Sequence, residues 1–200
     1  MNSRNISPEP FFRSSGVEAV ELGAAEVPRL QRFFDSNPEY FIAVNGDPAG
    51  EMEAHEEVFG ELPPGMSFTK KWVIGFPGKT GDLDAMINVV SDLLATGVWH
   101  IGLFIVATRM HGNGTAVRLL LHVQEWAVAG GARWLRLGVV EGNARAERFW
   151  KRSGFLEVRT REGVRMGAKV NAVRVMAKPL AGGTISEYLA LVPRDNPRAP

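Results

Sequence analysis

The sequence predicts a single α/β domain, of the α+β kind, with a mixed and mostly antiparallel central sheet flanked by helices. The chain has 200 residues, of which 45% are hydrophobic, enough for one sizeable core. Apolar runs of strand length alternate with segments of helical spacing. Two of these runs are joined by a Gly-rich turn and predict an antiparallel hairpin, whereas the later strand–helix–strand order predicts a parallel pair.

The first half of the chain is predicted to place two helices before the hairpin. Its expected elements are a strand at Val17–Gly23, a helix at Ala24–Asn37, a short strand or buried turn at Glu39–Val44, an acidic helix at Glu51–Leu62, and a hairpin of Lys70–Phe76 and Leu83–Leu94. The Gly-Lys-Thr in the hairpin turn is not a phosphate loop. That motif requires a glycine five residues before Gly78, and Val73 stands there.

The second half is predicted to alternate strands and helices. Apolar residues recur at i, i+3 and i+4 within Asn113–Gly130, and a Gly-Gly pair ends this helix. The other expected elements are strands at Val98–Val106, Arg133–Val140, 155–160 and 170–178, a short helix at Asn143–Gly154 and a loose tail at 196–200.

Composition excludes several classes of site and of location. The chain has no cysteine, which rules out disulfides, zinc–thiolate sites and a cysteine nucleophile, and permits a reducing cytosol. The first twelve residues do not resemble a signal peptide, and the apolar runs are too short to span a bilayer. We therefore expect a cytoplasmic protein with no membrane partner.

Charge is divided unevenly along the chain. Residues 1–100 hold 7 Lys and Arg against 15 Asp and Glu, whereas residues 101–200 hold 16 against 7. This asymmetry predicts two ligand faces of opposite charge. The alternative is that the two halves interleave in space and their charges mix.

The turn after the strand Val98–Val106 has the pattern R-x-x-G-x-G, formed by Arg109, Gly112 and Gly114. The first turn of the following helix offers backbone N–H groups without helical partners, and the helix dipole adds positive charge there. The glycines would let an anion approach the main chain, which favours phosphate or pyrophosphate. A plain strand-to-helix turn is the alternative. Gly102 favours the ligand-binding interpretation, because a glycine inside a strand often marks a place where a ligand comes close to the backbone.

With Asn143 and the Ser153-Gly154-Phe155 end of the next helix, this pattern resembles the GNAT superfamily of acyl-CoA-dependent N-acetyltransferases. The resemblance covers roughly residues 98–160. It implies one GNAT-like domain over residues 1–200, with an acceptor-side half at 10–95, an acetyl-CoA-binding core at 96–180 and a C-terminal tail at 181–200. It also implies a sheet splayed at a β-bulge in the strand 98–106.

The resemblance also implies a cofactor, acetyl-CoA, and a set of contacts to it. The backbone amide of Phe104 would polarise the thioester carbonyl. Asn143 would hydrogen-bond the cofactor, cap its helix, or both. Trp150 stands where the family often has a tyrosine acid, so it is predicted to pack, for example against pantetheine. The remaining contacts implied are Leu103 and Ile105 along pantetheine and Arg109, Met110, His111, Gly112, Asn113, Gly114 and Thr115 around the pyrophosphate.

The implied reaction is transfer of an acetyl group to a primary amine, on a small molecule or a peptide, by direct attack through a tetrahedral intermediate. A non-catalytic acyl-CoA-binding or sensing module is the alternative, and the tryptophan at position 150 is its best argument. Nucleic-acid binding ranks last, because the arginines are dispersed and lack interleaved aromatic residues. A homodimer is compatible with the sequence.

The catalytic base and the acceptor site have weaker signals. In strict alternation His100 would share a strand face with Phe104, which would suit a general base; the alternative is a half-buried histidine with no chemical role. We expect no metal site. Glu53 and Glu56 of the acidic segment, with Asn88, are candidates to bind a cationic acceptor, and a solvated helix face is the alternative reading of the glutamates.

Overall fold

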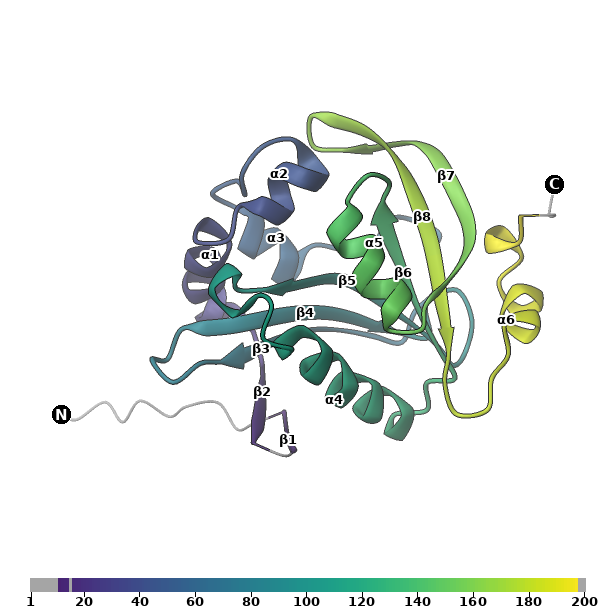
Figure 1. The fold of residues 1–200 in the computed structure, drawn as a ribbon, viewed down its shortest axis with the longest axis horizontal. Helices are drawn as coiled ribbons and strands as arrows, with labels where there is room; N and C mark the ends of the chain where they lie inside the picture. The colour runs from purple at the N-terminus through teal and green to yellow at the C-terminus, as the bar shows by residue number, and fades with distance from the viewer. Residues whose placement is uncertain (1–10, 15, 198–200) are drawn as a thin grey trace.

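The computed structural model describes residues 11–14 and 16–197. The expectation about the first ten residues, and the last three residues of the predicted tail, lie outside the described part. Figure 1 shows a twisted central sheet with helices on both of its faces.

The described strands form one eight-stranded sheet in the order β1-β2-β3-β4-β5-β6-β8-β7. Strands β5 and β6 are parallel, and every other neighbouring pair is antiparallel. The prediction of a mixed, mostly antiparallel sheet is confirmed. The strands are β1 Phe12–Ser14, β2 Val17–Glu21, β3 Lys70–Pro77, β4 Leu83–Ser91, β5 Val98–Val106, β6 Trp134–Val140, β7 Leu156–Met166 and β8 Lys169–Pro179.

The α-helices are α1 Val27–Asp35, α2 Glu39–Asn45, α3 Glu53–Phe59, α4 Thr115–Ala129, α5 Ala144–Arg152 and α6 Ile185–Leu191, with short 3₁₀ turns η1 Ala24–Glu26, η2 Thr108–Met110 and η3 Pro193–Asp195. Four α-helices lie close to their predicted positions, and two, α2 and α6, were not predicted as helices. The prediction of a short strand or buried turn at Glu39–Val44 was wrong. Phe41 and Val44 are buried at helical spacing, and Gly46 ends the helix in a left-handed conformation. An apolar run of this length fits either structure by periodicity alone.

Two apolar clusters pack against opposite faces of the sheet. One cluster joins α4 to the sheet through Leu120 and Val123, which pack with Trp99 and Ile101 of β5. The other joins α1 and α2 to the sheet, with Phe34 among its buried residues. Strand β5 belongs to both clusters, so its backbone passes between the two layers (Figure 1).

A β-bulge interrupts β5 at Gly102. Asn88 of β4 pairs with Leu103, but the next residue of β4 pairs with Ile101, so Gly102 is the extra residue. The side chains therefore change faces: Ile101 and Phe104 contact the α4 cluster, whereas Leu103 contacts the α1 cluster. The parallel pairing of β5 with β6 also ends at Ile101. The predicted splay and bulge are confirmed.

The bulge corrects the prediction that His100 shares a face with Phe104. Strict alternation holds only within an uninterrupted strand, and one extra residue reverses the faces beyond it. Ile101 and Phe104 lie on the same side of the sheet. His100, next to Ile101 and before the bulge, therefore points to the opposite side from Phe104.

The segment predicted as a C-terminal tail is folded over most of its length. Helix α6 begins with a capping box between Thr184 and Glu187, and η3 follows it. Tyr188 and Asp195 are fully buried against the sheet. The pattern Thr-x-x-Glu was the available signal for this helix.

Candidate functional site

The main cavity has a volume of about 920 Å³ and opens where β5 and β6 separate. Elements α2, β5, α4 and α5 contribute to its wall. Nine of the residues predicted to contact the cofactor line it: Phe104, Ile105, Met110, His111, Gly112, Gly114, Thr115, Asn143 and Trp150. The fold thus brings most of the predicted cofactor residues to one cavity.

The glycine turn has a geometry suited to an anion. Gly112 and Gly114 have φ of 81° and 82°, a region that other residues rarely adopt. Gly114 is the N-cap of α4 and has no side chain with which to cap the helix. The Asn113 side chain instead accepts a hydrogen bond from the Thr115 amide at 3.0 Å. The remaining first-turn amides point out of the helix end beside the cavity.

Three predicted cofactor residues, Leu103, Arg109 and Asn113, do not line the cavity. Arg109 instead anchors the turn to the start of β4. Its guanidinium lies 2.6 Å from the Asp84 carboxylate and donates to the Leu83 carbonyl at 3.1 Å. Its side chain therefore fixes the position of the turn.

An aromatic group forms the wall near the bulge. The rings of Phe104 and Trp150 lie 6.0 Å apart, and Trp150 is also in edge contact with Phe155 at 5.0 Å. Trp150 is almost buried, as predicted for a packing residue. Asn143 caps α5, because its side chain accepts from the Ala146 amide at 3.2 Å, and it also lines the cavity.

Basic side chains that were not predicted from the sequence lie around the same cavity. Arg145, Arg148 and Arg152 come from α5, and Lys178 comes from β8. Lys178 donates to Gln124 at 2.7 Å, and burial lowers the pKa of its ammonium group. The helical spacing of the three arginines was the signal available for this rim.

His100 lies in a different environment from the one predicted. A nitrogen of its ring is 3.3 Å from the Arg136 guanidinium, and Arg136 is held by Asp195. Burial, followed by the charge of Arg136, lowers the pKa of His100 to about 3. The imidazole is therefore neutral at physiological pH and is a weak base.

The two tyrosines occupy different regions. Tyr40 of α2 lines the main cavity together with Phe104. Tyr188 lies in the cluster beneath α6, where it donates to Asp195 at 2.6 Å. Of the two tyrosines, Tyr40 is therefore the one placed to contact a ligand in the cavity.

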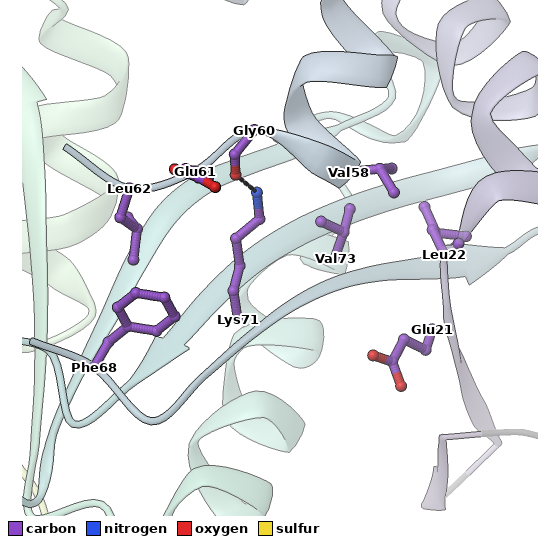
Figure 2. Close-up of a pocket in the computed structure, with 10 residues that line it drawn as sticks. Glu21, Leu22, Val58, Gly60, Glu61, Leu62, Phe68, Lys71 and Val73 are labelled. Atoms are coloured by element: carbon purple, nitrogen blue, oxygen red, sulfur yellow. Dashed lines mark hydrogen bonds between the residues drawn. The ribbon is translucent and has the colours of Figure 1, made fainter. Parts of the chain in front are cut away.

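Of the three predicted acceptor residues, Glu53 and Glu56 lie on α3, and Asn88 lies on β4 and contacts α3. Glu53 is half-buried and Glu56 is exposed. Asn88 is buried and donates a short hydrogen bond to Glu57, a glutamate of the acidic segment that was not among the predicted site residues. A second cavity, of about 520 Å³, lies beside α3 and β3 and contains Lys71 (Figure 2).

Among the described residues, no group of three or more histidine or carboxylate side chains is placed to hold a metal ion. Over the same ranges, no helix is both long enough and apolar enough to cross a membrane.

Comparison with known proteins identifies the class to which this fold and site belong. The family model described as acetyltransferase (GNAT) family matches residues 9–155. The chain therefore belongs to the GNAT acetyltransferase family. A sequence comparison with curated proteins gave no match.

Solved structures with similar folds are acetyltransferases. An acetyltransferase from Thermus thermophilus has a TM-score of 0.62 at 17% identity, over 82% of this chain and 97% of that one. The ribosomal-protein-S18-alanine N-acetyltransferase from Escherichia coli has 0.58 at 15%, over 83% and 95%. Spermidine N-acetyltransferase from Vibrio cholerae, in complex with CoA and spermine, has 0.63 at 13%, over 83% and 96%. At these identities the likeness concerns the fold.

Proposed function

We propose that this protein transfers an acetyl group from acetyl-CoA to a primary amine by direct attack through a tetrahedral intermediate. One observation carries the proposal: a single cavity is lined both by the glycine turn at the start of α4 and by the bulged segment of β5 at Phe104. The turn suits the anionic end of the cofactor, and the bulged segment lies where its thioester would be. Membership of the family supports the same reading.

The residues present fit coenzyme A. Its pyrophosphate would be bound by main-chain amides of the turn at Gly112 and Gly114, where neither residue has a side chain to block the approach. The α5 arginines that line the cavity would attract the phosphate group of coenzyme A that is not part of the pyrophosphate. Pantetheine would pass between the two layers along Phe104 and Ile105. The bound cofactor supplies an activated acetyl group with a thiolate as the leaving group.

The backbone of β5 would stabilise the negative charge that develops on the thioester oxygen during the reaction. Phe104 lies beyond the last residue of β5 that pairs with β6, so this part of the strand is not covered by β6. Its amide would donate a hydrogen bond to the thioester oxygen. This hydrogen bond would become stronger as the oxygen becomes negative. Trp150 and Phe149 pack near the Phe104 ring and exclude water there.

A non-catalytic acyl-CoA-binding module is the second candidate. Trp150 is the observation that favours it, because an indole cannot supply the proton that a tyrosine would. Two measurements separate the candidates. Calorimetric titration with acetyl-CoA should show binding in both cases. Release of free thiol from acetyl-CoA should accelerate on addition of an amine only for the enzyme, so binding without amine-dependent release would favour the module.

A further inference from the structure

Asn88 has a buried hydrogen-bond acceptor with no partner. Its side-chain nitrogen donates to a Glu57 carboxylate oxygen, and a carboxylate can only accept, so this contact fixes which way the amide faces. The Asn88 oxygen then points away from Glu57. It is buried and has no hydrogen-bond partner within the described residues, in a residue only 9% exposed. Buried acceptors are nearly always satisfied, so this oxygen is suited to a donor from outside the chain.

The bulge places an exposed glycine directly beside this oxygen. Gly102 is exposed, and a Cβ placed on it would lie 3.5 Å from both Cγ and Oδ1 of Asn88. A ligand group that packs over Gly102 would therefore lie close to the Asn88 carboxamide. The same ligand would lie two residues along β5 from Phe104, where the thioester is expected.

The surroundings of Glu57 are predominantly acidic. Glu53 lies one helical turn before it on α3. Tyr40 lines the main cavity and is near enough to these carboxylates to feel their charge, because its pKa is raised by burial and then by Glu57 and Glu53. From β3 the cation facing Glu57 is Lys71, whose ammonium group donates to the Gly60 carbonyl at 2.7 Å (Figure 2). The site thus favours a positively charged ligand.

We propose that Glu57 and Asn88 bind the ammonium group of the acceptor at the β5 bulge, and that Glu57 takes its first proton. The inference rests on the proposed function and names the acceptor side of the same site. The acceptor class is a small primary amine that carries no carboxylate near the reacting nitrogen, because Glu53 and Glu57 would repel one.

The proton and bond changes balance. The acceptor ammonium gives one proton to the Glu57 carboxylate and becomes a neutral amine. Its nitrogen forms a bond to the thioester carbon, and the carbonyl oxygen becomes negative against the Phe104 amide. The C–S bond then breaks as the carbonyl re-forms, and the second nitrogen proton leaves with the sulfur as the thiol. Glu57 returns its proton to solvent.

The electrostatics of Glu57 suit this role. Burial raises the pKa of the Glu57 carboxyl, and the Asn88 hydrogen bond and the Lys71 charge oppose that rise. A carboxylate with a raised pKa is a stronger base than an exposed one, which suits removal of a proton from an ammonium group.

The first test replaces Glu57 with the isosteric amide. Glu57→Gln should lower kcat/KM for 1,3-diaminopropane by about 10²–10⁴-fold, the usual contribution of a general base, with the Kd for acetyl-CoA unchanged. Glu162→Gln removes the same charge from an exposed position on β7 and should leave both values unchanged. Wild-type kcat/KM in Glu57→Gln, with acetyl-CoA still bound, would overturn the assignment but leave the proposed function standing. Failure of the wild type to bind acetyl-CoA would instead overturn the function.

The second test uses the pH profile, which a merely structural role would not shift. Asn88→Asp removes the donor to Glu57 and places a second carboxylate beside it, so the pKa of the pair rises. The acidic limb of kcat/KM, which reports the base that must be deprotonated, should move to higher pH. An unmoved limb would contradict the role of Glu57.

The third test concerns the acceptor class. 1,3-Diaminopropane and 3-aminopropanoate have the same length but end in an ammonium and a carboxylate. The diamine should have at least about tenfold higher kcat/KM, because a like-charge contact with Glu53 or Glu57 would disfavour the amino acid by about 1.4 kcal/mol, which corresponds to tenfold. In Glu57→Gln this preference should shrink. Equal use of the two amines by the wild type would contradict the inference.

Discussion

Gly112 provides the sharpest residue-scale prediction. Gly112→Glu would place a carboxylate where the pyrophosphate is expected and would force a non-glycine residue to adopt a φ of 81°. We expect the Kd for acetyl-CoA, measured by calorimetry, to rise at least about 100-fold. The carboxylate would repel the pyrophosphate, and the side chain would also block the approach of the pyrophosphate to the backbone. Gly182→Glu is the control, since Gly182 has a φ of 78° in the loop before α6. If both variants bound acetyl-CoA like the wild type, the glycine turn would not be the pyrophosphate site.

His100 leads to a prediction about stability. Its pKa is about 3 in the folded protein, below its ordinary value of 6.5. Between these values the unfolded chain binds more protons, so acidification favours unfolding. Between pH 7.5 and pH 5 this group alone should remove about 2 kcal/mol of unfolding free energy. Urea unfolding at both pH values should show a smaller loss in His100→Gln. An equal loss would place the titration elsewhere.

The functional residues could be predicted from sequence to different extents. The positions of the glycine turn and of Asn143 in the fold were predictable, because each lies between a strand and the helix that follows it. The orientation of the His100 side chain was not predictable. One extra residue at the bulge reverses the alternation of side chains between the two faces of the sheet, so simple alternation put His100 on the wrong face. Glu57 was one of five glutamates in a short segment, and only its contact with Asn88, 31 residues away, distinguishes it.

At the scale of elements, η3 after α6 is fixed to the sheet by one buried carboxylate. Asp195 accepts from Arg136 at 2.7 Å and 3.1 Å, from Arg161 at 2.9 Å and from Tyr188 at 2.6 Å. Arg136 lies on β6 and Arg161 on β7, so the carboxylate connects two strands and the C-terminal segment. The capping box predicts a helix here, but this long-range pairing cannot be read from the sequence.

The same network predicts the effect of removing its carboxylate. Asp195→Ala would leave Arg136 buried without its counter-ion, which typically costs about 3–5 kcal/mol. Urea unfolding at pH 7.5 should show a loss of that order. Glu162→Gln, an exposed carboxylate on β7, should change stability by less than about 0.5 kcal/mol. A loss in Asp195→Ala as small as that of the control would mean that the segment is held by its apolar contacts alone.

At the scale of the whole molecule, two charged regions meet at the bulge of β5. The arginines of α5 and the helix end of α4 lie on the side expected for coenzyme A, whereas the carboxylates of α3 lie near Asn88. This arrangement gives a structural reading of the acidic first half and basic second half of the sequence. The order of most elements was predictable from their periodicity, with α2 and α6 as the exceptions. The pairing of α3 with the bulge was not, because it depends on contacts between distant segments.

A crystal structure of the protein with acetyl-CoA tests the central claim most directly. We expect the pyrophosphate against the amides of Gly112–Gly114, the thioester oxygen within hydrogen-bonding distance of the Phe104 amide, and the acetyl group facing Gly102. A pyrophosphate bound away from the start of α4, or a thioester outside the β5 splay, would contradict it.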